Sequence, residues 1–133
     1  FSITQALHSY FSVSQIQNAE VIGLENKPYF NNLDKQIYQD SEASFNISEE
    51  VDRVYQEVQW PLELIDDGHS INIDAENSSS CVVWNPWIEK CAAMSGMCDE
   101  SYKTMLCIET TNAQEDTKTL QPQEKNSLKC VIA

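Results

Sequence analysis

Three polar residues, far apart in the sequence, lie in short segments that are typical of β-strands. His8 lies within residues 6–11, and Glu109 lies within the apolar residues 105–110. Asp52 lies within residues 50–55, beside Glu50 and Arg53. A carboxylate in the apolar setting of Glu109 is costly to bury without a purpose. A histidine and a glutamate on separate strands, converging on one cleft with an aspartate, can act as an acid–base pair.

Alternation of residue types along these segments predicts β-strands. In residues 6–13 the alternation places His8 and Tyr10 on the same face. Residues 104–110 are apolar almost throughout, which is typical of a buried strand, and they carry Glu109. We therefore expect His8 and Glu109 to come from two different strands, with Tyr10 lining the same cleft.

The rest of the chain shows short strands broken by polar turns. Further strands are expected at residues 20–23, 42–47, 51–58, 70–75, 81–84, 117–120 and 127–132, and short helical turns at residues 87–93 and 99–102. Residues 25–28 and 31–32 have the composition of turns, and Asp66-Asp67-Gly68 marks a tight turn. This pattern predicts an all-β sandwich with long connections.

Length and charge exclude several classes of function. At 133 residues the chain is one domain or part of one. A net charge of −13 opposes binding to nucleic acid or to an anionic membrane, because both reward basic patches. No apolar run approaches the roughly 20 residues that span a bilayer, so we expect a soluble protein. Because Phe1 directly precedes a predicted strand, we expect a partial domain that a missing N-terminal half or a partner chain completes.

The cysteines predict a reducing environment. Their number is odd and no Cys-x-x-Cys pair occurs among them: Cys81, Cys91, Cys98, Cys107 and Cys130. A zinc site and a disulfide framework are therefore not expected. We expect reduced, mostly buried thiols in a cytoplasmic protein.

Taken together, these segments resemble the C-terminal half of the glucose-6-phosphate 1-epimerase (hexose-6-phosphate mutarotase) family, within the aldose 1-epimerase (galactose mutarotase) superfamily. The resemblance covers nearly the whole chain and depends on five segments in the same order: Ala6-Leu7-His8-Ser9-Tyr10-Phe11, Val21-Ile22-Gly23-Leu24, Glu50-Val51-Asp52-Arg53-Val54-Tyr55, Val82-Val83-Trp84-Asn85-Pro86-Trp87 and Met105-Leu106-Cys107-Ile108-Glu109. It implies an all-β supersandwich of the galactose mutarotase type, of which residues 1–133 would form the C-terminal half.

The same resemblance implies roles for the three polar residues. His8 would be the catalytic acid, Glu109 the catalytic base and Asp52 a ligand of a sugar hydroxyl. Glu109 would take the proton of the anomeric hydroxyl while protonated His8 gives one to the ring oxygen, so that the C1–O5 bond opens and recloses as the other anomer. We expect the imidazolium to lower the pKa of the Glu109 carboxyl group. No metal and no other cofactor is required.

The substrate is less well defined than the chemistry. The family's phosphate-binding arginines lie in its N-terminal half, and Arg53, the only arginine here, cannot replace several bidentate donors. The preferred function is interconversion of the anomers of a hexose 6-phosphate. The alternatives are an epimerase for an unphosphorylated aldose and a non-catalytic sugar-binding or interaction module.

Some residues of these segments have plainer interpretations. His8 could be a hydrogen-bonded structural residue, and Glu109 could face solvent at a sheet edge. Trp84 and Trp87 could stack on a sugar, although we expect both to pack in the core. Asp52 and Arg53 are neighbours on a strand and point to opposite faces, so they should not pair directly.

Overall fold

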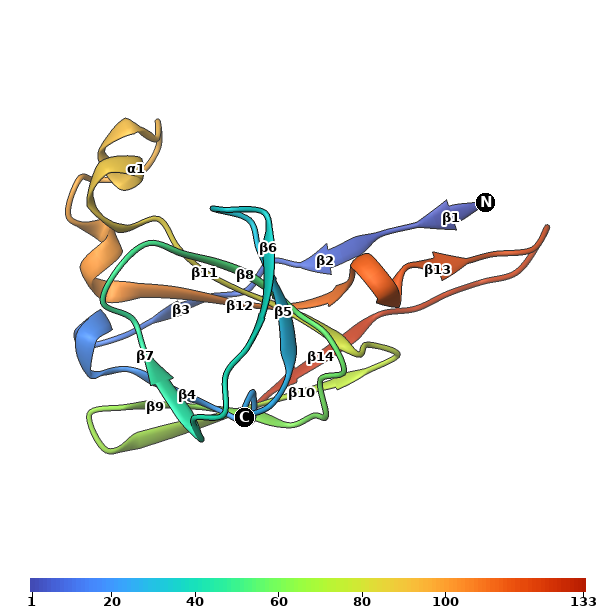
Figure 1. The fold of residues 1–133 in the computed structure, drawn as a ribbon, viewed down its shortest axis with the longest axis horizontal. Coiled ribbons are helices and arrows are strands. Elements are labelled where there is room, and N and C mark those ends of the chain that lie inside the picture. The colour runs from blue at the N-terminus through green and yellow to red at the C-terminus, as the bar shows by residue number, and fades with distance from the viewer.

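The computed structural model describes all 133 residues, Phe1–Ala133, and most of its regular secondary structure is antiparallel strand (Figure 1). The strands are β1 Ser2–Ile3, β2 Gln5–Leu7, β3 Tyr10–Ser12, β4 Glu20–Ile22, β5 Pro28–Asn31, β6 Gln36–Gln39, β7 Ser44–Asn46, β8 Val51–Tyr55, β9 Leu62–Asp66, β10 His69–Glu76, β11 Ser80–Asn85, β12 Met105–Asn112, β13 Lys118–Thr119 and β14 Lys129–Ile132. One α-helix, α1 Trp87–Ala93, and three 3-10 turns, η1 Ile16–Asn18, η2 Ser101–Thr104 and η3 Gln114–Asp116, complete the chain.

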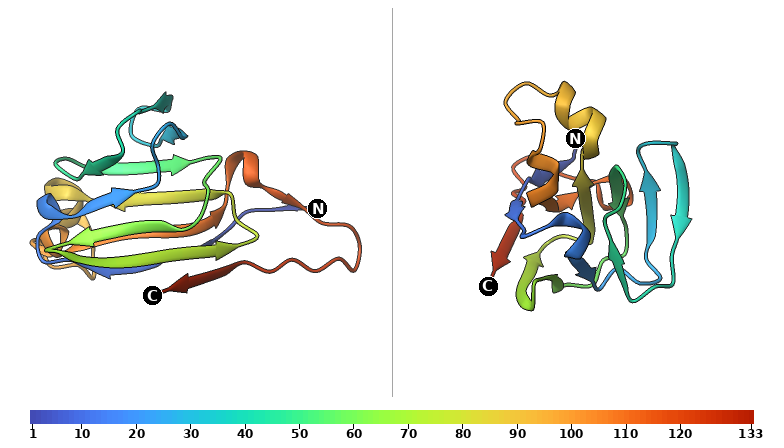
Figure 2. Two further views of the ribbon diagram at one scale, coloured as in Figure 1. Left: turned by 90° about the horizontal axis from the view of Figure 1, so that it is seen from below. Right: turned by 90° about the vertical axis from the view of Figure 1, so that its left-hand side faces the viewer.

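Two sheets form the body of the molecule. The larger has seven strands in the order β2-β12-β11-β8-β5-β6, with β3 also paired to β12, and the smaller has five in the order β14-β10-β9-β4-β7. A separate short ribbon joins β1 to β13. Figure 2 shows the β5–β6 hairpin standing away from the body of the molecule. The protein is therefore a β-sandwich, as the sequence predicts.

The apolar core lies between the two sheets and is built from alternate residues of their strands. The larger sheet contributes Phe11, Tyr55, Val83, Leu106 and Ile108, and the smaller sheet contributes Val21, Leu62, Leu64 and Ile73. Because side chains alternate along a strand, this arrangement turns the other residues of the larger sheet outward. The candidate catalytic residues belong to that outward set.

Most of the expected elements form, and α1 begins and ends at the expected residues. The tight turn between β9 and β10 also forms, with left-handed φ angles at Asp67 and Gly68. The turns expected at residues 25–28 and 31–32 form, at residues 25–26 and 32–35. The sequence pattern does not predict strands β5 and β6, which pair with each other on either side of the second turn, and β5 also pairs with β8. The sequence pattern also does not predict strand β9, although it predicts the turn that follows it.

All five cysteines are free, and Cys81, Cys91 and Cys107 are buried. This agrees with the expectation of reduced, mostly buried thiols. No helix of the structure has the length and hydrophobicity that crossing a membrane demands.

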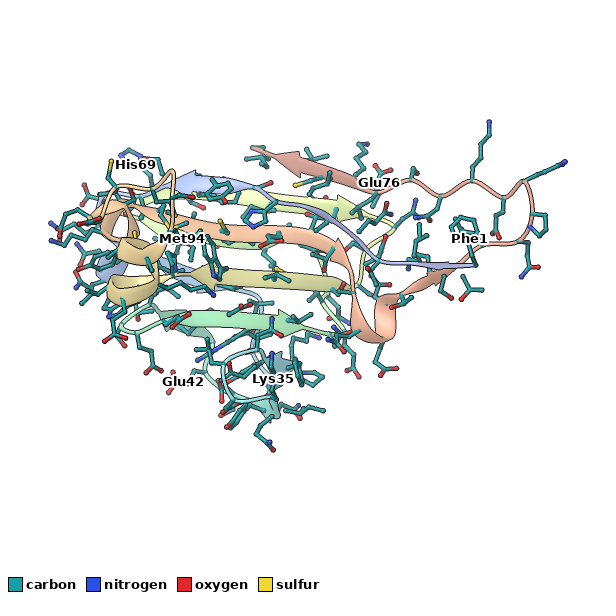
Figure 3. All side chains as sticks on the ribbon, turned by 90° about the horizontal axis from the view of Figure 1, so that it is seen from above. Phe1, Lys35, Glu42, His69, Glu76 and Met94 are labelled. Atoms are coloured by element: carbon teal, nitrogen blue, oxygen red, sulfur yellow. The ribbon has the colours of Figure 1, made fainter.

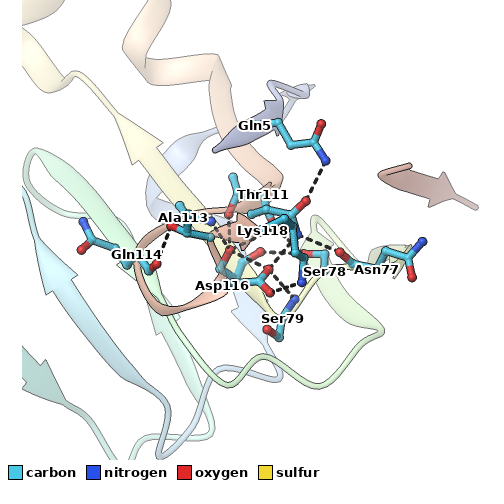
Figure 4. A network of polar contacts seen from close by, with 12 residues as sticks. Gln5, Asn77, Ser78, Ser79, Thr111, Ala113, Gln114, Asp116 and Lys118 are labelled. Atoms are coloured by element: carbon cyan, nitrogen blue, oxygen red, sulfur yellow. Dashed lines mark hydrogen bonds and ion pairs between the residues drawn. The ribbon is translucent and has the colours of Figure 1, made fainter. Parts of the chain in front are cut away.

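A buried polar network holds the connection from β12 to β13 against the sheet (Figure 4). At its centre the Asp116 carboxylate accepts hydrogen bonds from the Ser79 backbone N–H at 2.9 Å and from Asn112 Nδ2 at 2.8 Å. Lys118 Nζ lies 2.6 Å from the second oxygen. Burial by itself would raise the pKa of Asp116, but these donors favour the ionised form and hold the pKa below its ordinary value.

We predict that Asp116→Asn lowers the free energy of unfolding at pH 7 by about 1–3 kcal/mol, the usual penalty for a disrupted buried hydrogen bond. The folded-state pKa lies below the unfolded one. The stabilisation is therefore present above the unfolded pKa and is lost as the pH falls through the folded value. Urea denaturation at pH 7 and at pH 3 measures the free energy of unfolding of the protein and of Asp116→Asn, and so shows how their difference changes with pH. The exposed neighbour Glu115 provides the control, since Glu115→Gln should change stability by less than about 0.5 kcal/mol. An equal loss for Asp116→Asn at both pH values would contradict this account.

Candidate active site

The strand register places His8 opposite Glu109. The expected strand at residues 6–13 is interrupted, because His8 and Ser9 lie between β2 and β3. Both strands nevertheless pair with β12 in one continuous register: Leu7 is opposite Thr110, and Tyr10 is opposite Cys107. Since no residue is added or lost in the gap, the imidazole and the carboxyl group meet across adjacent strands.

His8 and Glu109 are in direct contact. Their Nε2 and Oε1 atoms are 3.2 Å apart. The His8 side chain is 47% exposed, whereas that of Glu109 is only 8% exposed. The imidazole is therefore reachable from outside, and the carboxyl group lies beneath it. A buried carboxyl group with a histidine as its ionic partner excludes the alternative of a solvent-facing edge residue at Glu109.

The expected cleft around this pair is not formed. None of the four cavities of the structure is lined by His8, Asp52 or Glu109. The pair lies instead on the outward face of the larger sheet, where β12, β11 and β8 run side by side (Figure 3). We therefore describe the site as an open sheet face.

Two aromatic rings fix the position of the imidazole. Tyr10 stacks on His8 with ring centroids 4.8 Å apart and an interplanar angle of 21°. Trp84 meets His8 edge-on, with centroids 6.0 Å apart. The prediction that Tyr10 shares the face of His8 is confirmed, and Tyr10 is 60% exposed.

Trp84 packs as expected, but not in the main core. It belongs to a smaller cluster with Met105 and Cys107 on the outward face. Met94 and Met97, from the segment after α1, pack against that cluster. Trp84 is thus a buried wall beside His8. Trp87 packs at the margin of the main core, as the sequence predicts.

Asp52 lies on the same outward face, two strands from Glu109. It is opposite Trp84 in the β8–β11 pairing. Its Oδ1 accepts a hydrogen bond of 2.8 Å from Asn32 Nδ2. Local pattern does not indicate this contact, because residues 31–32 have only the composition of a turn.

Arg53 faces the other way, as expected for the neighbour of Asp52 on a strand. Its guanidinium lies 4.6 Å from the centre of the Tyr29 ring and 5.1 Å from that of Phe45. Arg53 Nη1 is also 3.6 Å from an oxygen of Asp40. The only arginine of the chain is therefore engaged on the face opposite to His8 and Glu109.

Charge and burial act in opposite directions on Glu109. Burial raises its pKa most strongly, the positive charge of His8 lowers it, and the negative charge of Asp52 raises it again. The net result is a raised pKa. The contribution of His8 has the expected sign, but burial outweighs it. A carboxylate whose pKa is raised toward neutrality is a stronger base than an exposed one.

The nearby thiol does not offer a competing chemistry. Burial, together with the charge of Glu109, raises the pKa of Cys107 to about 12, so the thiol stays protonated near neutral pH. No three His, Cys, Asp or Glu side chains are arranged to hold a metal ion. The groups suited to chemistry on this face are the imidazole and the two carboxylates.

This combination of sandwich and site defines the class of protein. The fold is the β-sandwich of the mutarotases: the structure of a "putative mutarotase (YeaD)" from Salmonella typhimurium matches 84% of the chain with a TM-score of 0.78 and 30% identity. The structure of HI1317 matches 84% with a TM-score of 0.74 and 35% identity. The sequence leads to the same class, because the match to the aldose 1-epimerase family extends over residues 1–133 of this chain. The chain belongs to that family.

Curated relatives share a common description. The chain is 38% identical over 128 residues to a "Putative glucose-6-phosphate 1-epimerase" of Cenchrus ciliaris, covering 94% of this chain. It is 36% identical over 111 residues, or 82% of this chain, to a protein of Haemophilus influenzae with the same description. The matched region is 39% of the length of each relative. The two solved structures are likewise covered over 40% and 38% of their chains.

Opposite changes in the pKa of Glu109 would test the electrostatics of the site. Asp52→Asn should lower this pKa, because it removes a negative charge that disfavours ionisation. His8→Gln should raise it, because it removes the positive charge that favours ionisation. Carboxyl ¹³C NMR titration of the 133-residue chain, assigned with Glu109→Gln, measures both shifts. The exposed His69 provides the control, and His69→Gln should leave the titration unchanged. Shifts of the same sign in the two site variants would refute the account.

Proposed function

We propose that this chain carries the acid–base pair of an enzyme that interconverts the α and β anomers of a hexose 6-phosphate. The observation that carries the proposal is the 3.2 Å contact of His8 with Glu109, on the sheet face that also presents Asp52. Membership of the aldose 1-epimerase family supports a sugar substrate. The description of the relatives as glucose-6-phosphate 1-epimerases supports a phosphorylated one.

The adjacency of the two groups suits the chemistry. The anomeric hydroxyl oxygen and the ring oxygen are bonded to the same carbon, so the base and the acid that serve them must also be neighbours. Glu109 as carboxylate takes the hydroxyl proton, and protonated His8 gives its proton to the ring oxygen as the C1–O5 bond breaks. The electron pair of the O–H bond becomes the second bond of the aldehyde. Rotation about C1–C2 and the reverse proton transfers close the other anomer.

Asp52 is suited to bind the far side of the sugar. It lies two strands across the sheet and two residues along it from Glu109, a separation of about 12 Å between backbone positions. A single hexose ring can bridge such a span when a hydroxyl at each end donates a hydrogen bond of roughly 2.7–2.8 Å. We therefore assign Asp52 to substrate binding, and Tyr10, exposed beside His8, to the wall of the same site.

We further propose that residues 1–133 are the C-terminal half of the domain. Two observations support this: the chain spans about 40% of the length of its relatives, and the face with His8 is open. The arginine of this chain faces away from the site. The groups that bind the phosphate would then come from the other half of the domain or from a partner chain.

One observation favours a second substrate class. A phosphate needs cationic or multiple N–H donors, and the one guanidinium of this chain is held by Asp40 and two aromatic rings. An epimerase for an unphosphorylated aldose would need no such group. A sugar-binding module without turnover would keep the same face and lose only the proton transfers.

Substitution of either member of the pair should abolish turnover. In the longest natural protein that contains this chain, we expect Glu109→Gln and His8→Ala each to slow equilibration of fresh α-glucose 6-phosphate by about 10²–10⁴-fold. The rate is followed by polarimetry or by NMR of the anomeric proton. Matched controls are His69→Ala and Glu76→Gln, which change exposed residues of the smaller sheet.

The same experiment separates the alternatives. Site variants that are as fast as the unaltered protein would reject the proposed acid–base pair. Faster turnover of glucose than of glucose 6-phosphate would favour the unphosphorylated substrate. Binding of either sugar without any acceleration by the unaltered protein would favour the sugar-binding module.

A further inference from the structure

We propose that Asn32 is a positioning residue that fixes the Asp52 carboxylate for the sugar. The inference rests on the function proposed above and adds a residue to that site. It concerns a side chain at the end of β5, on the hairpin that extends beyond β8. Nothing in its local sequence distinguishes it from its neighbour Asn31.

Two hydrogen bonds tie Asn32 to Asp52. The Asn32 backbone N–H donates to the Asp52 carbonyl oxygen at 2.9 Å and continues the pairing of β5 with β8 by one residue. The Asn32 side chain donates from Nδ2 to Asp52 Oδ1 at 2.8 Å. The backbone hydrogen bond fixes the main chain of Asn32, and the side-chain hydrogen bond fixes one oxygen of the Asp52 carboxylate. Both bonds together leave the carboxylate little freedom to rotate.

The hydrogen-bond partner of the Asp52 carboxylate is a neutral amide. None of the six ion pairs of the structure includes Asp52. A lysine or arginine in the place of Asn32 would orient the carboxylate but would also neutralise it. The amide orients it and leaves the full negative charge on the open face. Asp52 Oδ2, which makes no hydrogen bond within the chain, then remains free to accept a sugar hydroxyl.

The adjacent asparagine has a different task, which makes a matched control available. Asn31 Oδ1 accepts a hydrogen bond of 3.0 Å from the Leu33 backbone N–H and so supports the turn between β5 and β6. Asn31 is paired with Arg53 and thus belongs to the opposite face of the sheet. Substituting each asparagine in turn therefore distinguishes the effect of supporting the turn from the effect of supporting Asp52.

The test compares Asn32→Ala with Asn31→Ala in the longest natural protein that contains the chain, with α-glucose 6-phosphate as substrate. We expect Asn32→Ala to raise KM about fivefold, the effect of one hydrogen bond, and to leave kcat within about twofold. A hydroxyl remote from C1 is bound equally in the ground and transition states, so its loss enters KM. Asn31→Ala should leave both constants unchanged.

A double-mutant cycle shows whether Asn32 acts through Asp52. In the background of Asp52→Asn, Asn32→Ala should have no further effect on KM. An unchanged KM for Asn32→Ala, an equal rise for Asn31→Ala, or a full additional effect in the Asp52→Asn background would each overturn the inference. Glu109→Gln is measured in the same series. If Glu109→Gln is inactive but Asn32→Ala leaves KM unchanged, this inference alone is rejected. If Glu109→Gln retains activity, both the proposed function and this inference are rejected.

Discussion

The register of β12 is the constraint on which the site depends. This strand pairs with β2 and β3 on one side and with β11 on the other, and its side chains alternate between the core and the outward face. Leu106 and Ile108 are completely buried in the core. A slip of one residue would turn Leu106 and Ile108 outward and place Glu109 in the core. Since an unpaired carboxylate in an apolar core is strongly unfavourable, the hydrophobic pattern of β12 also fixes the position of Glu109.

The same register determines the electrostatics. Glu109 lies on a strand that is paired on both sides and buried throughout, and its ionic partner His8 comes from the segment between β2 and β3 beside it. Burial and Asp52 oppose ionisation, whereas His8 favours it. A group held between such opposing influences is poised to exchange a proton. Groups of this kind recur at sites of catalysis, and they exist at some expense of stability.

Local pattern was enough to predict part of this arrangement. Alternation in residues 6–13 correctly placed His8 and Tyr10 on one face, and the apolar run around Glu109 correctly predicted a buried strand. The pairing of these two strands could not be deduced from local pattern, because it joins residues about one hundred positions apart. It followed only from the resemblance to a family. The contact of Asn32 with Asp52 is not predictable from local pattern for a similar reason, since it depends on the pairing of β5 with β8 and joins residues 20 positions apart. The expected cleft was wrong because the strands carry these residues on an outward sheet face, and none of the four cavities includes His8, Asp52 or Glu109.

The interruption at His8 and Ser9 has a mechanical consequence. Strands β2 and β3 pair only with β12, so they form a free margin of the larger sheet. Between them the Ser9 N–H bonds back to the Leu7 carbonyl at 3.0 Å instead of joining the ladder. His8 is thus carried by a break in the marginal strands, whereas Glu109 is carried by a strand that is paired on both sides. A polypeptide added along this margin would meet the segment that carries His8 before it met the strand that carries Glu109.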